Sequence, residues 1–148
     1  MYTLVVVDMQ PEFEAASGEY VVNNCLRQIK TAIECDAHII YLEYSGSGDT
    51  LPELKEPVEK YKHHYIEKKF TDDGSAEVQN AVNKNGLMIG RFRVVGVNTD
   101  WCIKSTVEGL RKRFPTSFVE VVVNACSSHD NHVKGIKLIE KIPHVDLI

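Results

Sequence analysis

The stretch Thr3-Leu-Val-Val-Val7 decides the fold, because it is a run of apolar and β-branched residues that is too short for a helix. Both faces of such a strand would be buried, which is typical of a strand inside a parallel sheet. The run ends at Asp8, so an acidic side chain follows the strand directly. We therefore predict a buried parallel strand over residues 3–7 with Asp8 at its carboxyl end.

The rest of the chain alternates between strand and helix patterns. Short apolar runs predict five further strands, at residues 38–42, 65–68, 93–97, 118–123 and 145–148. Apolar residues at helical spacing predict helices over 22–33, within 51–61 with an interruption at Pro57, from 73 or 75 to about 82, from 102 to 114, and over 129–141. Strands that alternate with helices imply right-handed crossovers. The expected architecture is α/β, a three-layer sandwich around a six-stranded parallel sheet.

Composition bounds the class of protein. The 148 residues, 43% hydrophobic and 26% charged, suit one domain over residues 1–148. A net charge of -4, with 17 basic and 21 acidic residues and no dense Lys/Arg run, gives no expectation of nucleic acid or membrane as a partner. The first apolar run meets Asp8 at once, so no signal-peptide core is expected and the predicted location is cytoplasmic. The four cysteines form no C-x-x-C pair, and no disulfide framework is expected.

Three reactive side chains directly follow the first, third and fourth predicted strands: Asp8, Lys68 and Cys102. Ligands bind at the carboxyl ends of the strands in such sheets, so these residues are expected along one edge. A thiol in the first turn of a helix is biased toward the thiolate, and the backbone N–H groups from Asn98 to Cys102 could hold an oxyanion. Acyl transfer by a cysteine nucleophile is the reaction class that this pattern favours.

The spacing also admits a structural interpretation. Free cysteine is among the most buried residue types, and an acidic residue at a strand end often caps neighbouring backbone groups. On that interpretation Cys102 and Asp8 would serve the core and the backbone, with no catalytic role.

Two segments resemble the signature segments of the isochorismatase-like cysteine hydrolases, the superfamily of the nicotinamidase-related amidases. They are Val5-Val-Val-Asp-Met-Gln-Pro-Glu-Phe13 and Val95-Gly-Val-Asn-Thr-Asp-Trp-Cys-Ile-Lys-Ser-Thr106. The segment Asn124-Ala-Cys-Ser-Ser128 is similar to the family's stretch after the fifth strand, so the resemblance covers nearly the whole chain. It implies a Rossmann-like, six-stranded parallel sheet.

By this resemblance, Asp8 matches the family's catalytic aspartate, Cys102 its nucleophile, and a lysine in Ile66-Glu-Lys-Lys-Phe70 the third member of its triad. We prefer Lys68, because it shares strand parity with Ile66 and lies nearer the strand end. Lys69 remains the alternative.

The mechanism implied by the resemblance passes through a thioester. Asp8 takes the proton of Cys102, the sulfur attacks a carbonyl, Lys68 holds both groups in place, and Asp8 then activates water. Because family members that act on isochorismate can lack the cysteine, Cys102 favours hydrolysis of an amide or ureido C–N bond in a small molecule.

Asn98, Trp101 and Phe13 are the expected oxyanion and substrate-binding residues. Trp101 and Phe13 could form apolar walls for a flat substrate, although either aromatic ring could equally pack in the core. The resemblance also implies a cis peptide bond between Val97 and Asn98.

No cofactor or metal ion is expected. The metal-binding nicotinamidases carry an Asp-x-His element after the second strand, and Tyr44-Ser-Gly-Ser-Gly-Asp49 contains none. The pairs His63-His64 and His129/His132 fit ordinary solvated histidines better than ligands. Because the connection after the second strand is short, a neighbouring subunit is expected to complete the site in a homo-oligomer.

Other functions compete with this hypothesis. A catalytically silent binding or scaffold protein could keep the family fold, and a hydrolase of an isochorismate-like vinyl ether could share it. Thiol redox chemistry has no resolving cysteine near Cys102 in the sequence, although Cys126 could approach it in the fold. A nucleotide-binding module is disfavoured because no glycine-rich phosphate loop follows any strand.

Overall fold

The computed structural model describes residues 1–148 and has one six-stranded, all-parallel sheet with the strand order β3-β2-β1-β4-β5-β6. The strands are β1 (Thr3–Val7), β2 (His38–Tyr44), β3 (His64–Lys69), β4 (Arg91–Val97), β5 (Phe118–Ser127) and β6 (Val145–Leu147). The α-helices are α1 (Glu19–Glu34), α2 (Pro52–Lys55), α3 (Ser75–Asn85), α4 (Lys104–Arg113) and α5 (His132–Glu140). Three short helical turns, η1 (Glu14–Ser17), η2 (Glu56–Val58) and η3 (Thr99–Ile103), complete the set. The predicted α/β fold with six parallel strands is confirmed.

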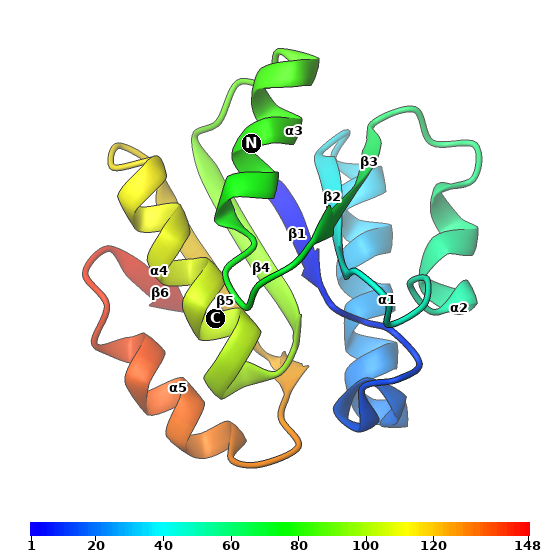
Figure 1. Ribbon diagram of the computed structural model, residues 1–148. Coiled ribbons are helices and arrows are strands. Elements are labelled where there is room, and N and C mark those ends of the chain that lie inside the picture. Colours follow the sequence, from blue (N-terminus) through cyan, green and yellow to red (C-terminus); the bar gives the residue numbers. More distant parts are fainter.

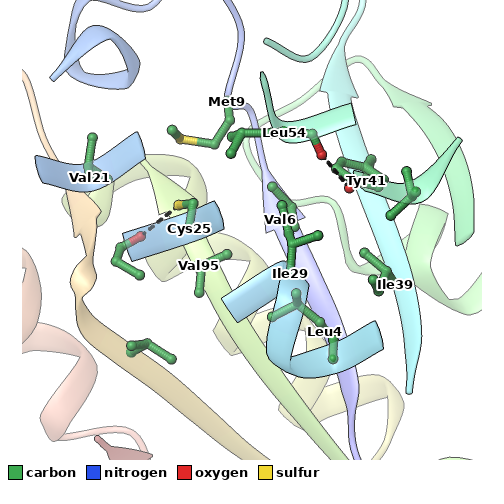
Figure 2. Packing of buried hydrophobic residues seen from close by; sticks show 14 of the residues in the cluster. Leu4, Val6, Met9, Val21, Cys25, Ile29, Ile39, Tyr41, Leu54 and Val95 are labelled. Atoms are coloured by element: carbon green, nitrogen blue, oxygen red, sulfur yellow. Dashed lines mark hydrogen bonds between the residues drawn. The ribbon is translucent and has the colours of Figure 1, made fainter. Parts of the chain in front are cut away.

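Helices cover both faces of the sheet and make the three layers (Figure 1). Alternate residues of the strands point to opposite faces, so Val6 and Tyr41 pack with α1 while Val7 and Leu42 pack with α3, α4 and α5. Each face carries a core cluster of 17 buried residues, so neither layer of helices is loosely attached. Figure 2 shows the cluster on the α1 side, where the Tyr41 hydroxyl donates to the Leu54 carbonyl at 2.7 Å.

Several boundaries differ from the sequence prediction for local reasons. The predicted helix within 51–61 is two short pieces, α2 and η2, because Pro57 breaks the helical hydrogen bonding. The last helix begins at His132, since the Asn131 side chain accepts the Lys134 N–H at 2.9 Å and caps it there. Strand β3 runs on to Lys69, whose carbonyl accepts the Ser45 N–H at 2.8 Å.

The reversal of strand order lies at β1, which pairs with β2 on one side and β4 on the other. Crossovers leave such a point in opposite directions, and the crevice between them is where ligands bind in open α/β sheets. Gly96 permits the close approach of the two strands here: its φ is +124°, and a Cβ on it would lie 2.1 Å from the Val7 carbonyl oxygen. The carboxyl ends of β1 and β4 therefore place Asp8 and η3 side by side. No helix combines the length and apolar character needed to cross a bilayer.

Candidate active site

Asp8, Lys69 and Cys102 meet at the carboxyl edge of the sheet. The Lys69 Nζ atom lies 2.8 Å from Asp8 Oδ2 and 3.4 Å from Cys102 Sγ. The side chains of Lys69 and Asp8 are 0% and 1% exposed, and Cys102 is 5% exposed. A cation thus bridges a carboxylate and a thiol out of contact with bulk water, where electrostatic interactions are strong.

The ammonium group of Lys69 is held from several sides. It donates to the Thr71 carbonyl at 2.9 Å and lies 4.3 Å from the centre of the Tyr44 ring. Fixed partners restrict the side chain of a lysine, whose four-carbon stem is flexible when it is exposed. Lys69 is therefore preorganised toward Asp8 and Cys102 before any substrate arrives.

Lys68 lies on the opposite face of the sheet, and the expectation that it sits beside Cys102 is wrong. Its side chain is 49% exposed, and its Nζ donates to Glu43 Oε1 at 2.6 Å. Burial alone would raise the pKa of Glu43, but hydrogen bonds from Lys68 and Thr50 outweigh burial and bring that pKa to about 2. Lys68 is thus the partner of a structural carboxylate, and the alternative, Lys69, occupies the place between Asp8 and Cys102.

The strand-parity argument selected the wrong lysine because Ile66 does not lie on the face of the sheet that carries Cys102. β3 is an edge strand, and Ile66 is 43% exposed, on the face of Lys68. Tyr65 points the other way and packs against the cluster that contains Cys102. Lys69 shares the parity of Tyr65, so the aromatic residue of the strand was the better guide to the buried face.

The surroundings of Cys102 favour the protonated thiol. Burial and the charge of Asp8 raise its pKa to about 12, although Lys69 lowers it. Burial likewise raises the pKa of Asp8, against the charge of Lys69. Burial and the Asp8 charge thus oppose the bias toward the thiolate that is expected for a thiol in the first turn of a helix. Asp8 is the carboxylate that shares the Lys69 ammonium group with this thiol.

Replacing Asp8 by asparagine is expected to speed alkylation of Cys102 by iodoacetamide at neutral pH by at least about tenfold, since a tenfold change needs only one pKa unit. The substitution removes the charge that raises the thiol pKa and leaves Lys69 to lower it. The check is the rate of Cys102 labelling against pH by peptide mass spectrometry, with exposed Cys35 as the internal control. An Asp8→Asn protein whose Cys102 labels no faster than the native one would contradict this charge assignment.

Asp8 has an uncommon backbone conformation. Its φ is +52°, in the left-handed region that side chains other than glycine seldom adopt. One carboxylate oxygen, Oδ2, faces Lys69, while buried Oδ1 has no hydrogen-bond partner. A buried acceptor of this kind is available to a proton from the thiol or from a substrate N–H.

Cys102 sits in η3, a π-helical turn, a rare form that often occurs at functional sites. The N–H groups of Trp101 and Ile103 both donate to the Asn98 carbonyl at 3.1 Å. The Trp101 N–H is therefore engaged within the turn and is not one of the groups from Asn98 to Cys102 that could hold an oxyanion. The predicted cis peptide bond between Val97 and Asn98 is confirmed.

Asn98, Trp101 and Phe13 line one pocket of about 260 Å³, together with Glu12, Glu14 and His129. Asn98 Oδ1 accepts the His129 N–H at 2.8 Å, which fixes the side chain at the pocket wall. Trp101 is 48% exposed and so does not serve the core. The structure thus gathers the three predicted substrate-binding residues beside the turn that carries Cys102.

Asp72 is a site residue that the sequence interpretation missed. It is exposed, and its Oδ1 lies 3.8 Å from Cys102 Sγ. The available signal was its position three residues after Lys69, in the loop that leaves the crevice edge. The next residue, Asp73, has a structural role instead, since its Oδ1 accepts the Ser75 N–H at 2.8 Å at the start of α3.

The residues after β2 do not fit the metal element of nicotinamidases. The loop offers one carboxylate, Asp49, which lies 3.5 Å from Lys68 Nζ. His129 pairs with Glu14 at 3.0 Å, and His132 with the Thr99 hydroxyl at 2.7 Å. No three histidine, cysteine or acidic side chains are grouped so as to hold a metal ion.

The chain is similar to a known protein family and to several solved structures. Residues 2–143 match the Isochorismatase domain, whereas no curated protein matches the sequence. The nicotinamidase SaPncA from Staphylococcus aureus shares 16% identity at a TM-score of 0.82, over 99% of this chain and 98% of that one. N-carbamoylsarcosine amidase from Thermoplasma acidophilum shares 17% identity at 0.81, over 99% and 94%. MAR1 ribonuclease from Caenorhabditis elegans shares 24% at 0.83, over 97% and 74%. These likenesses show the fold, and the match over nearly its whole length shows that this chain belongs to the Isochorismatase domain family.

Proposed function

We propose that this protein is a cysteine hydrolase that cleaves an amide or ureido C–N bond of a small molecule. The observation that carries the proposal is the Lys69 ammonium group between Asp8 Oδ2 and Cys102 Sγ, at 2.8 and 3.4 Å. A nucleophile, a base and a group that orients both, within contact distance of each other, are the parts that covalent catalysis requires. Two structural neighbours, a nicotinamidase and an N-carbamoylsarcosine amidase, act on C–N bonds by their names.

The first half of the reaction forms a thioester. Asp8 accepts the Cys102 proton as sulfur attacks the carbonyl carbon, and a tetrahedral oxyanion forms. The protonated Asp8 returns its proton to the leaving nitrogen, the C–N bond breaks, and the amine or ammonia departs. Lys69 keeps its charge throughout and offsets the charges that move between Asp8 and Cys102.

The second half regenerates the thiol. Asp8 takes a proton from water as the water oxygen attacks the thioester carbonyl. The C–S bond then breaks, sulfur recovers the proton from Asp8, and the carboxylic or carbamic acid leaves. Asp8 must be ionised to begin either half, and its raised pKa sets the acid limit of activity. Hydrolysis is therefore expected to fall as the pH drops through a value above the usual carboxyl range.

The test is ammonia release from small amides, beginning with nicotinamide, and from methylurea as a neutral ureido substrate, by native protein and by Cys102→Ser. Native turnover with an acyl adduct on the Cys102 peptide after acid quench would support the proposal. Loss of both signals in Cys102→Ser is expected, by about 1,000-fold or more in rate, since removing a nucleophile leaves only binding and oxyanion stabilisation. Equal ammonia release by the two proteins would refute it.

The geometry of the site gives less support to two other functions, a silent binding protein and a ribonuclease. A silent binding protein would have no need for a buried lysine between an aspartate and a thiol, a set that is costly to desolvate. Ribonuclease activity, which the name of the neighbour MAR1 gives, requires a polyanionic substrate, and the pocket lined by Asn98 and Trp101 includes Glu12 and Glu14 with no lysine or arginine.

A further inference from the structure

The charges around Cys102 are unbalanced toward the negative. The charges of Asp8 and Lys69 offset each other. The Lys69 ammonium group also donates to the Thr71 carbonyl and contacts Cys102, so its hydrogen bonds are used by the protein itself. Asp72 adds a carboxylate 3.8 Å from Cys102 Sγ. Because Asp72 is exposed while the sulfur is 5% exposed, this carboxylate lies on the solvent side of the thiol.

The pocket lined by Asn98 and Trp101 has the same character. Its ionisable lining residues are Glu12, Glu14 and His129, and it contains no lysine or arginine. His129 Nδ1 is already paired with Glu14 Oε2 at 3.0 Å. An anionic group on a substrate would therefore meet Asp72 beside the sulfur, or Glu12 and Glu14 in the pocket, and the pocket offers no lysine or arginine to pair with it.

The apolar and polar parts of the site point to the ligand's other properties. Phe13 and Trp101 offer aromatic surface, on which a flat ring or a cation can stack. The buried Oδ1 of Asp8 lacks a partner and is an acceptor for a donor group such as an amide N–H. Both features suit a neutral or cationic amide.

We propose that this site selects substrates that are neutral or cationic next to the scissile C–N bond and rejects those with a carboxylate or phosphate there, with Asp72 as the specificity-determining residue. The inference rests on the proposed function, since it names the substrate class of the same site. It separates neutral amides, and amides that carry an ammonium group, from N-carbamoyl amino acids, whose carboxylate would approach Asp72. It also disfavours RNA and isochorismate-like anions.

The test uses iodoacetamide and iodoacetate, which are nearly equal in size and differ in charge. The labelling rate of Cys102 with each reagent is measured on the folded protein by peptide mass spectrometry and divided by the rate at exposed Cys35. In the native protein the amide should outpace the anion. In Asp72→Asn this preference should fall about tenfold, as expected for one unit charge near the sulfur, and added salt should weaken it in the native protein.

Asp146→Asn is the matched control, because Asp146 is exposed in β6, at the opposite edge of the sheet from β3, and the substitution changes the net charge by the same amount. It should keep the native preference. An Asp72→Asn preference within twofold of the native value, or native labelling by iodoacetate as fast as by iodoacetamide, would overturn the inference.

The alkylation test can succeed or fail independently of the ammonia-release test, because alkylation of Cys102 needs no substrate turnover. A charge preference set by Asp72 in a protein without ammonia release would remove the hydrolase and with it the substrate assignment. Ammonia release with no effect of Asp72→Asn on the reagent ratio would remove the substrate class and leave the hydrolase standing.

Discussion

Lys69→Met is expected to lower kcat/KM for the hydrolysed amide by about 100- to 1,000-fold, because it removes preorganised charge from the reacting groups. Without the ammonium group, the pKa of Asp8 rises further, since the Lys69 charge is what opposes the effect of burial. Asp8 then keeps its proton to a higher pH, so less of it is ionised and able to act as a base. The free energy of unfolding should also fall by about 3 kcal/mol, the usual cost of leaving one member of a buried ion pair alone.

Lys68→Met is the matched control, one residue away in the same strand. Its side chain is 49% exposed, and Glu43 keeps contacts with Thr50 and Lys55 after the loss. We expect kcat/KM within about twofold of native and a change in unfolding free energy below about 1 kcal/mol. Steady-state kinetics and urea unfolding of the two variants decide the matter: a larger kinetic loss in Lys68→Met than in Lys69→Met would reverse the assignment of the catalytic lysine.

Gly96→Ala is expected to destabilise the protein by about 4 kcal/mol, the combined scale of backbone strain and overpacking. The backbone has φ +124°, a conformation that L side chains rarely adopt. An added Cβ would lie 2.1 Å from the Val7 carbonyl oxygen and 2.8 Å from its nitrogen, both backbone atoms that cannot move aside without parting β1 from β4. Since Asp8 follows Val7, the surviving folded protein should also lose activity.

Gly86→Ala supplies the comparison. Gly86 also has positive φ, +62°, at the end of α3, but a Cβ there meets nothing within 4 Å. Only the left-handed backbone is penalised, so the expected loss is about 1 kcal/mol. Chemical unfolding of both variants measures the difference, and equal losses would show that the contact with Val7 has no weight.

The sequence predicted the parts of this molecule that depend on local pattern. The run from Thr3 to Val7 is β1 within the bounds expected, and strand–helix alternation was enough for a parallel sheet, because chain connectivity and handedness leave few alternatives. Asp8 and Cys102 came together for the same reason, as they follow the two strands that lie side by side at the reversal of strand order.

The features that were missed depend on three-dimensional surroundings. Which lysine points inward is decided by where β3 lies in the sheet, at an edge with Ile66 half uncovered, and no periodicity reveals an edge. The pKa of Cys102 depends on its depth and on Asp8, two quantities absent from a motif. Asp72 reaches the sulfur from a loop, where spacing carries no geometric rule.

The adjacent residues Lys68 and Lys69 also help to fix the pairing register of β3. An edge strand is held on one side only, and slipping by one residue would exchange its two faces. A slip that brought Lys68 toward Asp8 would set Glu67 against Glu43, and the opposite slip would offer Phe70 to Asp8. Only one register of β3 against β2 therefore places a lysine beside each of the two buried carboxylates, Asp8 and Glu43. The ion pair at the crevice thus also helps to fix the register of this edge strand.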